Sequence, residues 1–103
     1  MLDENVLRES ILDVTLRGWK ISSGTYVDTS ISCCCPLGAV CVAKGLDHQD
    51  GDRVEQAIEE EIGWGRNEMF SFISGFDGCR TYVGMYPDTF NLGQKFRKEY
   101  LNK

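Results

Sequence analysis

Residues 36–43 read Pro-Leu-Gly-Ala-Val-Cys-Val-Ala and carry the strongest structural signal in the chain. Pro36 has a fixed φ that suits the first turn of a helix, and Gly45 is placed to end that helix. Residues 37–43 are all apolar or glycine, and a helix that is hydrophobic on all sides is buried. Several of these residues are small, so neighbouring elements can approach closely. We therefore predict that this helix forms the centre of the core.

The segment before this helix predicts another one over residues 3–17. Leu7, Ile11 and Val14 recur there at helical spacing, and Gly18 is placed to stop the helix. Acidic residues are concentrated toward its start and a basic residue lies at its end, which suits the helix macrodipole.

Three further helices are expected after the central one. Asp52 caps a predicted helix over residues 53–62, which has one apolar face and an opposite face of glutamates. Asn67 caps a shorter helix with dense aromatic bulk. A final helix begins near Asp88 or Thr89.

Residues 19–32 follow a different pattern. Residues 25–27 favour strands and residues 22–24 favour a turn, so we expect an irregular arm that contains at most a short hairpin. Residues 81–83 form a second candidate strand.

These elements predict a single mainly α domain over residues 1–103, a bundle of four to five short helices with a small β-hairpin as its only sheet. An α+β fold is the alternative. We expect four aromatic residues to pack around the central helix: Trp19, Phe70, Phe76 and Phe96.

Composition limits the setting and the partners. The chain has 103 residues, 42% of them apolar and 26% charged, which is typical of one ordinary globular domain. Eleven basic and sixteen acidic residues give a net charge of −5, which argues against a nucleic-acid-coating role. No apolar run approaches the roughly 18 residues that a bilayer requires, and the N-terminus lacks a signal-peptide core. We therefore expect a cytoplasmic protein that does not contact membranes.

The chain has five cysteines, three of them consecutive at 33–35 and the others at Cys41 and Cys79. Cys34 and Cys35 lie where the central helix begins, and the partial positive charge of a helix N-terminus stabilises a thiolate. They are therefore the reactive-thiol candidates of a cysteine-dependent enzyme or redox protein.

Other roles for the cysteines are weaker. A disulfide framework normally has an even count and an oxidising compartment. Zinc sites use Cys-x-x-Cys pairs, which are missing, and His48 is the single histidine. We expect no metal ligands and no cofactor, and we favour small, reduced cysteines that pack around the central helix.

Residues 47–61 contain seven acidic residues and one basic residue, a net charge of −6. This stretch lacks the oxygen ligands of an EF-hand calcium loop. It is either a solvated helix face or a surface that docks on a basic partner. The tryptophan that follows, between two glycines, is either a recognition anchor or a lid on the core. The candidate docking residues are Asp50, Asp52, Glu55, Glu59, Glu60, Trp64 and Arg66.

Motifs of common enzymes are missing, including the phosphate-binding loop, the serine nucleophile elbow and the zinc protease helix. We therefore expect a non-enzymatic interaction or regulatory protein whose partner presents a basic surface with an apolar pocket. The basic residues near the C-terminus leave a homodimer open. A thiol-dependent enzyme and a metal-stabilised structural domain are the alternatives.

Three short motifs occur in order: C-P-L-G-A at residues 35–39, F-x-x-G-F-D-G at 72–78 and L-G-x-x-x-R at 92–97. Together they resemble small hypothetical proteins of bacteria and their phages. The resemblance implies a bacterial or phage setting and implies no activity.

Overall fold

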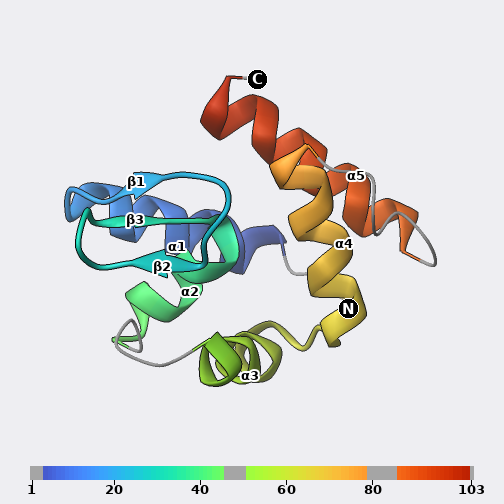
Figure 1. The fold of residues 1–103 in the computed structure, drawn as a ribbon, viewed down its shortest axis with the longest axis horizontal. Helices are drawn as coiled ribbons and strands as arrows, with labels where there is room; N and C mark the ends of the chain where they lie inside the picture. The colour runs from blue at the N-terminus through green and yellow to red at the C-terminus, as the bar shows by residue number, and fades with distance from the viewer. Residues whose placement is uncertain (1–3, 46–50, 79–85, 103) are drawn as a thin grey trace. The chain divides into compact units, whose positions relative to one another are not determined.

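The computed structural model describes residues 4–45, 51–78 and 86–102, and of residues 51–54 the backbone alone. These residues form a mainly helical fold with a small three-stranded sheet (Figure 1), which confirms the predicted fold class. The chain divides into two compact units, an N-terminal unit over Met1–Gly63 and a C-terminal unit over Trp64–Lys103.

The first helix of the N-terminal unit, α1 (Glu4–Leu16), has the predicted apolar face. Leu7, Ile11 and Val14 are buried. Gly18 takes a positive φ of 94° just beyond the helix, as expected of a residue that stops one. On the outer side of α1, Leu12 and Leu16 remain 60% and 78% exposed, since their positions fall outside the buried stripe.

The central helix α2 (Pro36–Ala43) is buried over almost its whole length, as predicted. Cys35 is its N-cap, and the Cys35 Sγ accepts a hydrogen bond from the Gly38 amide at 3.4 Å. A Cβ at Gly38 would collide with the carbonyl oxygen of Tyr26, and the Cys35 amide donates to that same oxygen at 3.1 Å. The chain that precedes α2 therefore lies directly against its first turn.

That preceding chain forms a sheet of three two-residue strands, β1 (Lys20–Ile21), β2 (Val27–Asp28) and β3 (Cys33–Cys34). Their order is β1–β3–β2 (Figure 1), with β1 parallel and β2 antiparallel to β3. Cys33 is the register partner of Lys20 on one side and of Asp28 on the other.

The expected hairpin is therefore wrong in detail. β1 and β2 do not pair with each other because β3, which the pattern did not predict, lies between them. Backbone hydrogen bonds continue beyond the strands, from the Lys20 amide to the Ser32 carbonyl at 3.0 Å and from the Ser22 amide to the Cys34 carbonyl at 2.9 Å.

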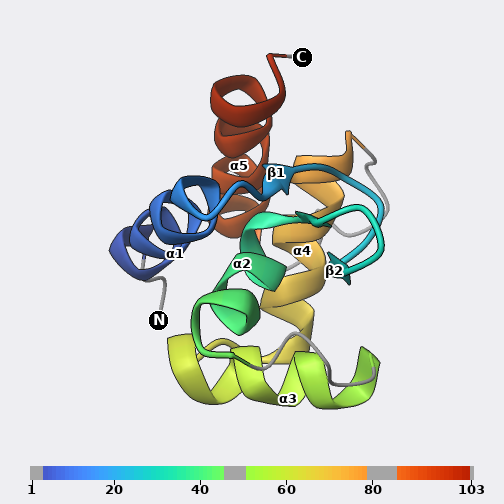
Figure 2. The ribbon, with the colours of Figure 1, turned by 90° about the vertical axis from the view of Figure 1, so that its left-hand side faces the viewer.

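Helix α3 (Gly51–Ile62) completes the N-terminal unit and contacts α2 (Figure 2). It begins before Asp52, so this residue lies within the first turn and is not its cap. Ile58 and Ile62 are buried, which confirms the apolar face at these two positions.

The C-terminal unit consists of α4 (Arg66–Asp77), α5 (Pro87–Phe96) and a short π-helix, η1 (Arg97–Leu101), that continues α5. Gly65, and not Asn67, is the N-cap of α4, and its amide donates to the Glu68 carboxylate at 3.4 Å. Residues 79–85, including the candidate strand at 81–83, lie outside the described residues.

Helices α4 and α5 lie side by side (Figure 1) and meet through two glycines. A Cβ at Gly75 would collide with the Phe90 carbonyl oxygen, and a Cβ at Gly93 would collide with the Phe72 carbonyl oxygen. The two backbones are therefore in direct contact, an approach that only glycine permits at either position.

An aromatic core fills the remaining space in the C-terminal unit. The Phe72 ring has centroid distances of 5.5 Å to Trp64, 5.5 Å to Phe96 and 6.3 Å to Phe76. Phe72, Phe76 and Phe96 are fully buried. The expectation that Phe76 and Phe96 surround α2 concerns contacts between the two units and stays a prediction.

Candidate functional site

The cysteine segment has a structural role in the N-terminal unit. Cys33 and Cys34 form the middle strand of the sheet, and Cys35 caps α2. The Cys33 thiol is half-buried and donates to the Ile31 carbonyl at 3.6 Å, whereas Cys34, Cys35 and Cys41 are buried.

The environment of Cys34 opposes thiolate formation. Burial, together with the nearby Cys33 and Cys41 thiols, raises the pKa of Cys34 from 9.0 to about 12. The expected helix-terminal stabilisation is therefore wrong for Cys34, since the loss of hydration outweighs it. Cys35 is 5% exposed and its sulfur already serves the cap, so neither candidate thiol presents an open nucleophile.

Within residues 4–45, 51–78 and 86–102, no group of three or more histidine, cysteine, aspartate or glutamate side chains is arranged to hold a metal ion. His48 and Cys79 lie outside these ranges. Cys33, Cys34, Cys35 and Cys41 are free thiols.

The acidic candidate residues from Asp52 to Glu60 belong to α3. Glu60 is exposed on the side of the helix opposite Ile58 and Ile62, and Glu59 is half-buried at the flank of that buried face. Asp50 lies outside the described residues, and of Asp52 only the backbone is described.

Some of the α3 carboxylates have partners within the N-terminal unit. The Tyr26 hydroxyl donates to Glu55 Oε1 at 3.3 Å, and Lys44 Nζ lies 3.7 Å from Glu61 Oε2. The Gln56 amide donates to Glu60 Oε1 at 3.4 Å. Glu55 therefore helps attach α3 to the chain around β2, while Glu59 and Glu60 provide the outward charge.

Trp64 is not an exposed anchor. Its side chain is 2% exposed and packs on Phe72, so the core-lid interpretation describes it and the docking interpretation loses its aromatic residue. Trp64 Nε1 is buried and has no hydrogen-bond partner among the described residues. Arg66, at the start of α4, is exposed.

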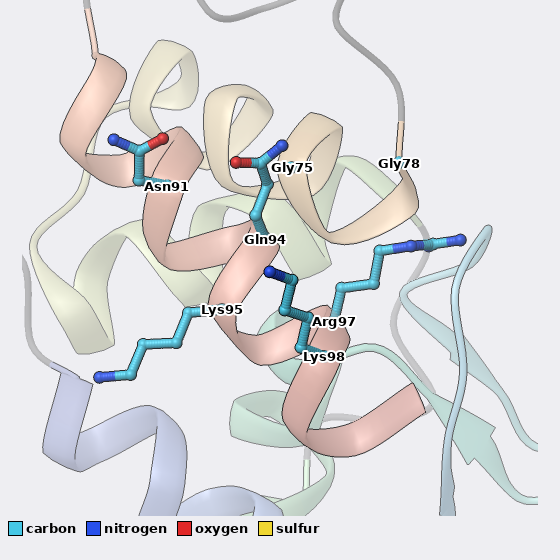
Figure 3. A pocket seen from close by; sticks show the side chains of 7 residues that line it. All are labelled: Gly75, Gly78, Asn91, Gln94, Lys95, Arg97 and Lys98. Carbon is cyan, nitrogen blue, oxygen red and sulfur yellow. The ribbon is translucent and has the colours of Figure 1, made fainter. Parts of the chain in front are cut away.

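The structure adds a polar groove in the C-terminal unit that the sequence analysis missed. It has a volume of about 540 Å³ and lies between the end of α4 and the consecutive helices α5 and η1, over residues 91–98 (Figure 3). Among the residues that the structure describes, those that line the groove are all polar or glycine: Gly75, Gly78, Asn91, Gln94, Lys95, Arg97 and Lys98. The basic cluster at 95–98 was the available signal, but it resembles an ordinary basic helix C-terminus.

Arg97 holds one end of this groove in place. Its Nη1 donates to the Phe76 carbonyl at 2.6 Å, at the C-terminal end of α4. Gly78 ends α4 with a left-handed φ of 77°, and a Cβ there would lie only 3.1 Å from the Arg97 guanidinium carbon. The guanidinium therefore packs over a position where a side chain would displace it.

A smaller pocket of about 260 Å³ in the N-terminal unit is lined by Val6, Glu9, Ser10, Asp13, Ala43, Lys44 and Glu61. Its charges are largely neutralised within the unit. Asp13 pairs with Arg17 at 2.9 Å, and Glu61 pairs with Lys44.

Comparison of the chain with protein-family models, curated proteins and solved structures found no significant match. None of the helices in the described part of the chain has the length and apolarity needed to cross a membrane.

Proposed function

We propose that this protein is a non-enzymatic interaction or regulatory protein that acts through protein–protein contacts in the bacterial cytosol, encoded by a bacterium, a phage or another mobile element. The observation that carries the proposal is the two-sided character of α3. Ile58 and Ile62 attach the helix to its unit. The exposed Glu60 carries a negative charge on the opposite side, and the half-buried Glu59 carries another at the flank of the buried face.

Residues of the three sequence motifs have structural roles in the fold, which supports the proposal of a non-enzymatic protein. Cys35 caps α2, Gly38 lies against Tyr26, and Gly75 and Gly93 form the helix crossing. Arg97 binds the carbonyl at the end of α4. These roles account for the motifs without a catalytic step, and the raised pKa of Cys34 weighs against the thiol-enzyme alternative.

Exposed carboxylates on a helix attract a basic surface over a long range and so accelerate its association. The partner expected for α3 therefore presents lysine and arginine side chains. With Trp64 buried, this partner does not need an apolar pocket, and its binding depends strongly on salt.

The test is affinity capture from the native host with the full chain as bait, read by mass spectrometry. We compare wild type with a Glu59→Gln/Glu60→Gln variant. The matched control is Glu9→Gln/Glu99→Gln, which removes the same charge from exposed positions elsewhere.

The proposal expects a protein retained by wild type and by the control, lost from the α3 variant and released by salt. With purified components, the α3 variant should slow association and leave dissociation nearly unchanged. The proposal would be contradicted if all three baits retained the same proteins equally, or if no retained protein depended on Glu59 and Glu60.

A further inference from the structure

The groove of the C-terminal unit concentrates positive charge in a chain whose net charge is −5. Lys95, Arg97 and Lys98 all belong to its lining. In the part of the chain that the structure describes, neither Arg97 nor Lys98 forms an ion pair with a carboxylate. No carboxylate in the described part of the chain therefore neutralises the charges of Arg97 and Lys98. A bound anion would relieve the repulsion between these two side chains.

Two of these cations frame the groove from different directions. Figure 3 shows Lys98 reaching back along the helix toward Gln94, while Arg97 extends toward Gly78. The hydrogen bond from Arg97 Nη1 to the Phe76 carbonyl fixes the guanidinium. Since a guanidinium has five N–H donors, the others stay available on a pre-organised group.

The rest of the lining is suited to hydrogen bonding. Gln94 and Asn91 contribute carboxamides from α5, and Gly75 and Gly78 leave the α4 side free of side chains. The volume of about 540 Å³ falls in the range of small-molecule sites. None of the described residues that line the groove has an apolar side chain, so the matching ligand is polar and anionic.

We propose that this groove binds a small phosphate-bearing molecule, with Lys98 and Arg97 as its cationic contacts and Gln94 as a neutral hydrogen-bonding contact. Phosphate oxygens accept from several donors at once, and a guanidinium with an ammonium is a common donor set for them. This site is independent of the α3 surface and of the function proposed for it.

The test is an amide chemical-shift titration by NMR of the full chain with sodium pyrophosphate, at an ionic strength held constant with sodium chloride. A nucleoside diphosphate forms a second arm. Saturable shifts should be confined to residues 91–98 and Gly78, and pyrophosphate should raise the midpoint of thermal unfolding. If the nucleoside diphosphate binds more tightly than pyrophosphate, the groove also contacts the nucleoside. If the two bind equally, the groove recognises the diphosphate alone.

Lys98→Gln is the decisive variant, since Arg97 also supports the end of α4 and its replacement could unfold the unit. This variant should weaken pyrophosphate binding about tenfold. The matched control, Lys20→Gln, removes the same charge from an exposed position on β1 and should bind as wild type does.

Three results would overturn the proposal. They are shifts that do not saturate and equal those caused by sodium chloride, equal weakening by Lys20→Gln, or saturation by a short single-stranded oligonucleotide when pyrophosphate fails. The last result would assign the groove to nucleic acid instead of a small molecule.

Discussion

The N-terminal unit contains twelve acidic and five basic residues, whereas the C-terminal unit contains four acidic and six basic residues. Their net charges are therefore −7 and +2. The N-terminal unit packs its other elements around one wholly apolar helix, and the C-terminal unit joins two helices through glycines and an aromatic core. A modest net charge of −5 for the whole chain therefore conceals two units of opposite net charge.

The largest effect on stability is expected at the single tryptophan of the C-terminal unit. Trp64→Ala should destabilise the protein by about 3–5 kcal/mol, because it leaves a cavity against Phe72. Trp19→Ala in the N-terminal unit should cost less, since Trp19 is half-buried. Urea denaturation measures both. Trp64→Phe should recover most of the loss, since the Trp64 N–H has no partner among the described residues. If Trp64→Ala lowered the free energy of unfolding only slightly, Trp64 would again be a candidate docking residue.

Gly93→Ala tests the helix crossing and should cost about 3 kcal/mol, because the new Cβ forces α5 away from the α4 backbone. Amide hydrogen exchange should show the loss of protection concentrated in α4 and α5. Asn91→Ala, at an exposed position on the same helix, is the control and should change little. If α1 and α2 lost protection equally, the division into two units would not describe how the protein unfolds.

A pH effect is expected from Cys34 in the N-terminal unit. The pKa of Cys34 is about 12 in the folded chain against 9.0 ordinarily, so the unfolded chain releases this proton first as pH rises. The stabilising contribution is complete below pH 9 and is lost progressively between pH 9 and pH 12. Denaturation across this window should show a shallower decline for Cys34→Ala than for wild type. Rapid alkylation of Cys34 at neutral pH would contradict the expectation.

The smallest effect is expected from the surface charges. Glu59→Gln/Glu60→Gln should change the free energy of unfolding by less than about 0.5 kcal/mol, since both residues lie outside the core. Lys98→Gln in the C-terminal unit should be similarly mild. Urea denaturation at low and high salt measures both variants. A larger change in the free energy of unfolding of either variant would mean that the replaced charge stabilises the fold.

The sequence predicted best what depends on local apolar pattern. The helices α1 and α2 were located to within about one residue, because Leu7, Ile11 and Val14 mark one face and residues 36–43 are apolar throughout. The strand at Cys33–Cys34 was missed because two residues are too few to show an alternating apolar pattern. Its formation depends on pairing with β1 on one side and β2 on the other.

The candidate site was less predictable. The close contact at Gly75 and Gly93 was not predicted, since nothing local shows that each faces a carbonyl of the other helix. Trp64 between two glycines has the same local pattern whether it is exposed or buried. The groove required Gly78 and Arg97 to be brought together from separate helices, which residue spacing alone does not specify.

The crossing of α4 and α5 has a consequence for how this sequence can change over time. Because Gly75 and Gly93 each face the backbone that carries the other, a side chain at either one separates the same pair of helices. Once the helices have separated, the second replacement meets little further obstruction, so the two losses should be far from additive. The two positions therefore behave as one unit of variation, in which glycine is kept or lost at both together.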